Sequence, residues 1–214
     1  MGIPPVIAAP RDLDAEQMAD IERFEQAIEQ YLAGEIHEDV FRVMRLNNGV
    51  YGQRQGGTNQ MVRIKLPAGT ITPEQLDLMA YLSTEFSRGW GHITTRQNIQ
   101  FNWPKLADVP DMLQALADVD MHAIQTSGNC IRNVTADHFA GVAADEVEDP
   151  RPTAELMRQW SSLHPEFSFL PRKFKIAITG AQHDRAAIKA HDIGIRILRH
   201  PQSGDTGYEI SVGG

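Results

Sequence analysis

Basic and amide side chains concentrate in four short stretches of this 214-residue chain, each beside residues with strand-forming character. They are Arg63-Ile64-Lys65, Thr94-Thr95-Arg96-Gln97-Asn98, Arg132-Asn133 and Arg172-Lys173-Phe174-Lys175. Alternate residues of a strand face the same side, so Arg63 shares a face with Lys65, Lys173 with Lys175, and Arg96 with Asn98 and Gln100. Cations converging in one cleft would bind a small anion or a polycarboxylate cofactor. The alternative for each stretch is a solvated strand face with surface ion pairs, but four together favour a site.

The charge distribution agrees with an anion-binding body. The net charge is -8, but residues 1–40 hold ten Asp or Glu and two Arg, whereas the remaining 174 residues hold eighteen acids and eighteen bases. The whole chain has 15 Arg and 5 Lys, and arginine suits bidentate recognition of carboxylates and oxyanions. No basic stripe with interleaved aromatic residues is present, so we expect no nucleic-acid partner.

The residue types favour neither a metal site nor a membrane-spanning helix. Cys130 is the one cysteine, so it cannot form an internal disulfide or by itself supply a structural zinc site or an iron–sulfur cluster. No histidine pair has a metal-ligand spacing, so we expect no metal ligands among these residues. No apolar run reaches the roughly 18 residues of a spanning helix, and the first residues lack signal-peptide character. We therefore expect a cytoplasmic protein without membrane association.

The elements that must position these side chains begin with an acidic leader. Met18, Ile21, Phe24, Ile28 and Leu32 recur at helical spacing and predict an amphipathic helix from Asp12 to Ala33, ending at Gly34. Beyond it we expect a strand over 61–66, a helix to about Phe86 capped by Thr72 and Gln75, one or two strands over 92–103, a helix from Asp108 through Leu116, and a strand over 121–126. The order β-α-β-β-α-β predicts a ferredoxin-like, α+β unit.

A second unit follows a polar segment. Residues 127–150 have little periodicity and are predicted to be a functional loop or a boundary. We then expect a helix over 153–163, a strand over 173–179, a short helix over 185–189, and strands over 193–198 and 208–212. Val212-Gly213-Gly214 is typical of the start of a turn, so we expect the polypeptide to continue. The predicted division is 1–40, an acidic helical leader; 41–126, the ferredoxin-like half-domain; and 127–214, an incomplete α/β domain.

Three motifs resemble one family over about residues 40–214. TTRQNIQF, GNCIRNVT and LPRKFKIAITG, in this order after a GVYGQR segment, resemble the siroheme-dependent nitrite and sulfite reductases. The resemblance implies a ferredoxin-like half-domain followed by the first part of the α/β siroheme-binding domain, with siroheme coupled to a 4Fe-4S cluster. The family's cluster cysteines form a C-x5-C and C-x3-C pair that is absent here, so the cluster ligands are expected outside this chain.

The resemblance also implies roles for individual residues. Arg63, Arg132, Lys173 and Lys175 would line the catalytic face of siroheme. Because arginine rarely releases a proton, we expect Arg63 and Arg132 to bind the oxyanion and the two lysines to deliver protons. The residues implied as partners of the siroheme carboxylates are His92, Thr94, Thr95, Arg96, Gln97, Asn98, Gln100 and Asn133. His92 stands where family members often carry arginine, and the alternative for it is a satisfied strand histidine.

The function implied is the N-terminal part of a siroheme-containing sulfite reductase, which reduces sulfite to sulfide with six electrons from ferredoxin or a flavoprotein subunit. An assimilatory nitrite reductase, forming ammonia, is the close alternative. If the chain is naturally this short, the alternative is a non-catalytic module that binds an anion or a partner protein. We expect the 214 residues alone to be inactive and, with an apolar face exposed, to self-associate.

Overall fold

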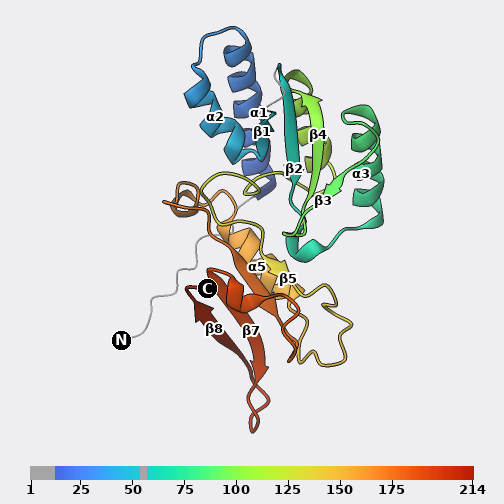
Figure 1. The fold of residues 1–214 in the computed structure, drawn as a ribbon, viewed down its shortest axis with the longest axis vertical. Coiled ribbons are helices and arrows are strands. Elements are labelled where there is room, and N and C mark those ends of the chain that lie inside the picture. The colour runs from blue at the N-terminus through green and yellow to red at the C-terminus, as the bar shows by residue number, and fades with distance from the viewer. Residues whose placement is uncertain (1–12, 54–56) are drawn as a thin grey trace.

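The computed structural model, which describes residues 13–53 and 57–214, has the predicted α+β class. Two units each contain a four-stranded sheet, with strand orders β1-β2-β4-β3 and β5-β6-β7-β8 (Figure 1). The first residues of the predicted leader and Arg54 of the GVYGQR segment lie outside the described residues. The division at residues 40 and 126 remains a prediction. No helix of the described ranges is long and apolar enough to cross a membrane.

The first sheet is antiparallel, with two different faces. Its strands are β1 (Val50–Gly52), β2 (Asn59–Ile64), β3 (His92–Ile93) and β4 (Ile99–Lys105). On one face Val62 lies opposite Phe101, and both are buried. On the other face Arg63 lies opposite Gln100. The strands predicted over 61–66 and 92–103 are therefore confirmed, whereas the three-residue strand β1 was not predicted.

Helices α3 (Pro73–Glu85) and α4 (Val109–Ala117) contribute to the core on the apolar face of this sheet. The predicted capping box of α3 is confirmed, since the Gln75 amide donates to Thr72 Oγ1 (3.2 Å) and the Thr72 amide to Gln75 Oε1 (3.0 Å). The helix predicted from Asp108 is confirmed as α4, with Asp108 at its N-cap position. A 3-10 turn, η2 (Leu106–Asp108), leads directly into the helix, and Asp108 makes no side-chain capping bond.

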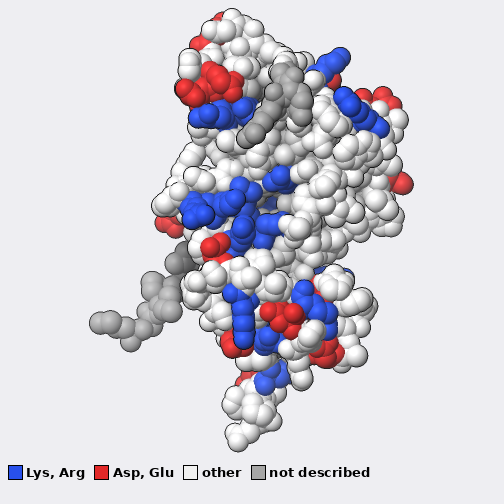
Figure 2. All heavy atoms as spheres, in the orientation of Figure 1, with Lys and Arg blue, Asp and Glu red and all other residues white. Residues whose placement is uncertain are grey.

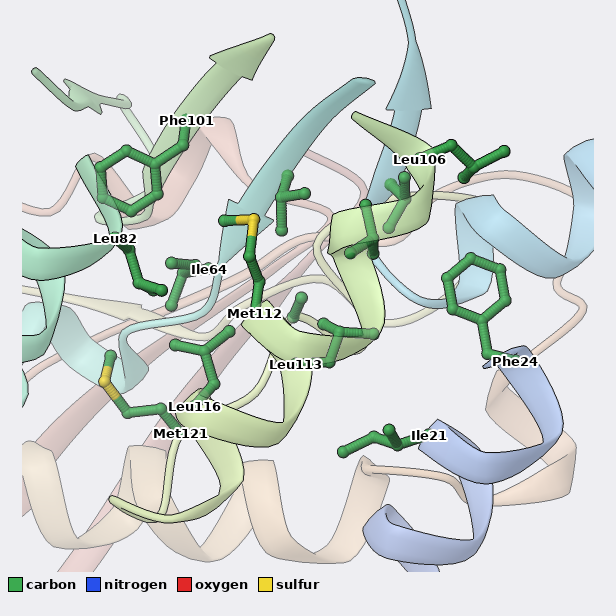
Figure 3. Close-up of a cluster of buried hydrophobic side chains, with 14 of the residues drawn as sticks. Ile21, Phe24, Ile64, Leu82, Phe101, Leu106, Met112, Leu113, Leu116 and Met121 are labelled. Atoms are coloured by element: carbon green, nitrogen blue, oxygen red, sulfur yellow. The ribbon is translucent and has the colours of Figure 1, made fainter. Parts of the chain in front are cut away.

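The acidic leader contributes to the same hydrophobic core. In α1 (Leu13–Leu32), the predicted apolar positions Ile21, Phe24 and Ile28 are buried in one cluster with residues of the sheet, α3 and α4 (Figure 3). A second helix, α2 (Glu38–Asn47), was not predicted. Its buried Phe41 stacks on Tyr31 with ring centroids 4.1 Å apart, which fixes α2 against α1.

The strand predicted over 121–126 is wrong, and the edge of β2 explains why. Residues 121–126 make a single antiparallel bridge, between His122 and Lys65. The rest of that edge is occupied by β1 and Gly49, whose carbonyl oxygen accepts from the Arg63 amide at 3.0 Å. The neighbouring residues of 121–126 consequently have no free strand to pair with.

In the second unit, β5 (Thr135–Ala136), β6 (Ile176–Thr179) and β7 (Ile193–Arg199) are parallel, and β8 (Thr206–Val212) is antiparallel to β7. Helix α5 (Arg151–Ser161) contributes buried Ala154 to its core. The predicted helix over 153–163 and the later strands are confirmed in type. The segment 127–150 is not all loop, because β5 is buried within it. The short helix predicted over 185–189 is instead a 3-10 turn, η4 (Ile188–Ala190).

Candidate functional site

A row of polar side chains crosses the sheet face opposite the α3–α4 core. Gln100 of β4 lies between Arg63 of β2 and His92 of β3 in the strand register. Gln100 Oε1 accepts from Arg63 Nε at 3.2 Å and from Nη2 at 3.0 Å. A hollow of about 290 Å³ opens over this row, lined in part by Tyr51 and Asn102. The alternation of the strands thus brings three predicted site residues to one surface.

The backbone carbonyl oxygen of Thr126 brings the two predicted anion-binding arginines together. It accepts from Arg63 Nη1 (3.1 Å), from Arg132 Nη1 (2.8 Å) and from the Tyr51 hydroxyl (3.3 Å). Arg132 also donates from Nε (3.2 Å) and Nη2 (2.9 Å) to the carbonyl oxygen of Gly128. Both guanidinium groups are therefore held in fixed positions, while each keeps at least one N–H group without an acceptor among the described residues.

Lys173 and Lys175 join this group through the strand that leads into β6. Between them, the Phe174 amide donates to the Cys130 carbonyl oxygen (3.0 Å), and the Phe174 carbonyl oxygen accepts from the Arg132 amide (2.8 Å). Within residues 13–53 and 57–214, neither lysine ammonium has a hydrogen bond or an ion pair. Figure 2 shows Lys and Arg side chains gathered across the middle of the molecule, between the two units. We call Arg63, Arg132, Lys173 and Lys175 with their surroundings the basic cleft.

The turn over 94–98 has a different environment. Thr94 Oγ1 accepts from the amides of Arg96 (3.3 Å) and Asn98 (3.2 Å), and Thr95 is exposed. Gln97 adopts a φ of +55° and engages Ala136 at both amide ends, with Nε2 to the carbonyl oxygen (2.9 Å) and Oε1 to the amide (3.0 Å). Gln97 therefore fixes the half-domain against β5.

Two buried asparagines extend this connection. Asn133 Nδ2 donates to Asn98 Oδ1 at 2.9 Å and to the Leu66 carbonyl oxygen at 2.7 Å. Both side chains are almost fully buried, and Asn133 Oδ1 has no hydrogen-bond partner. Their present contacts are between protein groups, so cofactor binding by Gln97, Asn98 and Asn133 remains a prediction.

Arg96 is a charged group with backbone partners. Its Nη2 donates to the carbonyl oxygens of Asn133 and Ile176, the latter at 3.1 Å, and its buried Nε has no partner. Burial and the nearby Arg132 charge lower the Arg96 pKa to about 10, so it remains protonated at neutral pH. No carboxylate of the described residues is within ion-pair distance of it. A ligand carboxylate would supply the missing counter-charge.

Two contributors to the site were missed by residue-type reasoning. Thr126 acts through its backbone carbonyl, which no side-chain pattern reveals. Tyr51 lies in the GVYGQR segment, which resembles the family but has no residue among the predicted site residues. Its hydroxyl accepts from Arg63 Nη1 at 3.0 Å, and its ring lies 4.9 Å from the Arg63 guanidinium carbon.

The residues present do not fit an iron–sulfur cluster. Such clusters are held by several thiolates, and Cys130 is the one cysteine of the chain. Its thiol is buried and donates to the Ser127 carbonyl oxygen at 3.0 Å. Burial raises the Cys130 pKa, which opposes the thiolate form that a metal requires.

The two units, each with a four-stranded sheet, define an α+β protein whose basic side chains gather between them. Residues 51–119 match the nitrite/sulfite reductase ferredoxin-like half domain, and residues 127–214 match the nitrite and sulphite reductase 4Fe-4S domain. The chain therefore belongs to the nitrite and sulfite reductase family.

Relatives of both names are found. A sulfite reductase [ferredoxin] 1 of Mycolicibacterium paratuberculosis is 32% identical over 154 residues, covering 72% of this chain and 27% of the relative. An assimilatory ferredoxin-dependent nitrite reductase of Haloferax mediterranei is 31% identical over 179 residues, covering 78% and 30%. The chain thus spans about a quarter of the length of the first of these relatives.

Solved structures give the same fold. The NirA protein of Mycobacterium tuberculosis superposes with a TM-score of 0.79 and 29% identity, over 96% of this chain and 41% of that chain. Dissimilatory sulfite reductase I shares the fold at a TM-score of 0.56 and 13% identity, over 90% of this chain and 55% of that chain.

Proposed function

We propose that this chain is the N-terminal part of a siroheme-containing sulfite reductase, which reduces sulfite to sulfide with six electrons. The observation that carries the proposal is the basic cleft, where two fixed arginines lie beside the strand that carries Lys173 and Lys175, whose ammonium groups have no partner among the described residues. Its residues come from both of the segments that match the family. Nitrite reduction to ammonia is the alternative, because relatives of both names match.

The donor set of the cleft fits siroheme, whose carboxylates need cationic and N–H partners. Arg96 and Arg132 donate to carbonyl oxygens and not to acids, so their charges are available to a carboxylate-rich ligand. His92 and Gln100 lie on the same sheet face and add two polar side chains. When bound, siroheme supplies the iron at which the oxyanion is reduced.

The four residues of the cleft have two roles, anion binding and proton delivery. Arg63 and Arg132 hold the anion, because their guanidinium groups are fixed and remain charged. Lys173 and Lys175 deliver protons to the oxygen atoms that leave as water, because an ammonium can release a proton and both side chains are free to reorient. Positive charge in the cleft also offsets repulsion between the oxyanion and the cofactor carboxylates.

The remaining parts of the reaction lie outside this chain. The 4Fe-4S cluster needs several cysteines, and this chain contains one. We propose ferredoxin as the electron donor, in line with the names of the relatives. The location that we propose is the cytoplasm, as the sequence predicts. The 214 residues alone are then inactive.

The test is mutation of the cleft in the full reductase. Lys175→Ala and Arg132→Ala should each lower sulfite turnover at least about tenfold, equivalent to roughly 1.4 kcal/mol. Lys105→Ala, which removes an exposed lysine at the far end of β4, is the control. Unchanged kinetics in both cleft variants would remove these residues from the mechanism. Comparing kcat/KM for sulfite and nitrite in the same preparations decides between the two substrates.

A further inference from the structure

A second cavity lies away from the basic cleft, between the start of α3, the 3-10 turn η1 (Pro67–Gly69) and α5. Its volume is about 500 Å³, and it shares no lining residue with the hollow over Arg63 and Gln100. Side chains of Pro67, Met121 and Pro152 give it apolar walls. The size is that of an ordinary small-molecule site.

The cavity contains a buried lysine without a counter-charge. Lys65 lines it, is only 2% exposed, and donates from Nζ to Gln125 Oε1 at 2.7 Å. Gln125 is neutral and is itself held by Ser161 and Ser162. In the part of the chain that the structure describes, no acid forms an ion pair with Lys65. A buried ammonium with one neutral partner is strongly disfavoured unless an anion joins it.

The neighbouring charged groups do not supply that anion. Glu155 is engaged by Arg158, with Nε to Oε2 at 2.8 Å and Nη2 to Oε1 at 2.6 Å. Arg158 Nη1 lies 3.1 Å from His122 Nε2, and since guanidinium only donates, that nitrogen accepts and His122 is neutral. Burial and the Arg158 charge lower the Lys65 pKa to about 7. Glu155 therefore offsets Arg158, whereas Lys65, when charged, has no acid within ion-pair distance among the described residues.

We propose that this cavity binds a small organic monocarboxylate, whose carboxylate accepts from Lys65 Nζ and whose carbon chain packs on Pro67, Met121 and Pro152. The other bases of the lining, Arg151 and Arg158, are paired with Asp149 and Glu155, so one ammonium is left for a ligand and a single negative charge is favoured. The site is independent of the proposed reductase function, because none of its residues belongs to the basic cleft.

The test uses the five lysines of the chain as separate reporters. With lysine labelled at Cε, NMR follows Lys65 in the cavity, Lys173 and Lys175 in the cleft, and exposed Lys105 and Lys189 as internal controls. Propionate is the probe, and propionamide, of the same shape without charge, is its matched control. Propionate should shift the Lys65 signal in a saturable way and raise the midpoint of its pH titration by about one unit. Propionamide should do neither.

Variants assign the signal and the site. Lys65→Met should abolish the saturable effect of propionate, and Lys105→Met should leave it unchanged. If Lys65→Met fails to fold, the two probes on the unmodified chain still decide. The proposal is overturned if propionate moves only the Lys173 and Lys175 signals, which would place anion binding in the cleft alone. An equal Lys65 response to propionamide would also overturn it. Neither result touches the reductase assignment, which rests on turnover of the cleft variants.

Discussion

Single residues show how the cleft combines rigid and free cations. Arg63 makes bonds to Gln100, Tyr51 and Thr126, so its charge is placed by the sheet and not by a ligand. Among the residues that the structure describes, no group bonds to the ammonium of Lys173 or Lys175. Under the proposed function, the arginines would recognise the small anion and the lysines would move protons.

The buried Lys65 predicts an unusual dependence of stability on pH. Its pKa is about 7 in the folded chain and near 10.5 when exposed, so between these values the unfolded chain binds the extra proton. Folding stability should therefore rise with pH through this window, by at most about 1.4 kcal/mol per pH unit from this group.

Lys65→Met isolates that contribution. In urea denaturation without added anions, the variant should exceed the unmodified chain in free energy of unfolding most clearly near pH 7, and the difference should shrink toward pH 9. Lys105→Met should show no such trend, because Lys105 is exposed. A difference between Lys65→Met and the unmodified chain that stays constant with pH would show that Lys65 is charged in the folded state throughout.

At the scale of elements, the sequence predicted those with strong local signals. The capping box predicted the start of α3, alternation predicted β2, and strand-forming residue types predicted β4 and β7. The missed elements have weak local signals. Strand β1 is three residues long, β5 is two, and α2 is capped by His37, which is an uncommon capping residue. These elements exist because tertiary neighbours pair with them.

The same limit applies to the candidate site. Alternation predicted that Arg63 shares a face with Lys65, and Gln100 with Arg96 and Asn98. The structure instead places Lys65 in the second cavity, and Arg96 and Asn98 in the turn before β4, because the strands end at Ile64 and begin at Ile99. Residue types and alternation did not predict the Thr126 carbonyl that joins Arg63 to Arg132, nor the packing of Gln97 on Ala136. Those contacts depend on how two separate units meet, which no local pattern encodes.

The turn between α2 and β1 gives a prediction at this scale. Gly49 has a φ of +74°, and a Cβ there would lie 2.3 Å from the Ala123 carbonyl oxygen. Gly34 has a similar φ of +78°, but a Cβ there meets nothing within 4 Å. Gly34→Ala should cost about 1 kcal/mol of unfolding free energy from backbone strain alone. Gly49→Ala should cost clearly more, upward of about 3 kcal/mol, because segment 121–126 must move.

Chemical denaturation of the two variants separates the cost of backbone strain from the cost of the steric clash with the Ala123 carbonyl oxygen. Equal losses would mean that the Gly49 turn can relax without disturbing residue 123. The site would then not depend on this turn. A larger loss for Gly49→Ala should be accompanied by changes around Thr126, since the Thr126 hydroxyl donates to the Ala123 carbonyl oxygen at 2.7 Å.

For the whole molecule, the second sheet presents an apolar edge. Ile195 and Ile197 of β7 are buried. Their register partners on β8 are Ile210 and Tyr208, which lie on the same face of the sheet and are 60% and 51% exposed. Strand β8 is the last strand of its sheet, as Figure 1 shows. Exposed apolar edge strands template pairing with another chain.

We therefore expect the 214-residue chain to self-associate through β8, with light scattering showing a mass above 23.9 kDa that rises with concentration. Ile210→Lys should shift the equilibrium toward monomer by placing a charge on the apolar face. Ser211→Lys, on the other face of the same strand, is the matched control. If only Ile210→Lys acts, apolar burial drives association, and if both act equally, pairing along the strand edge does. A monodisperse monomer at all concentrations would contradict the prediction and would mean that this edge is too weakly apolar to need a partner.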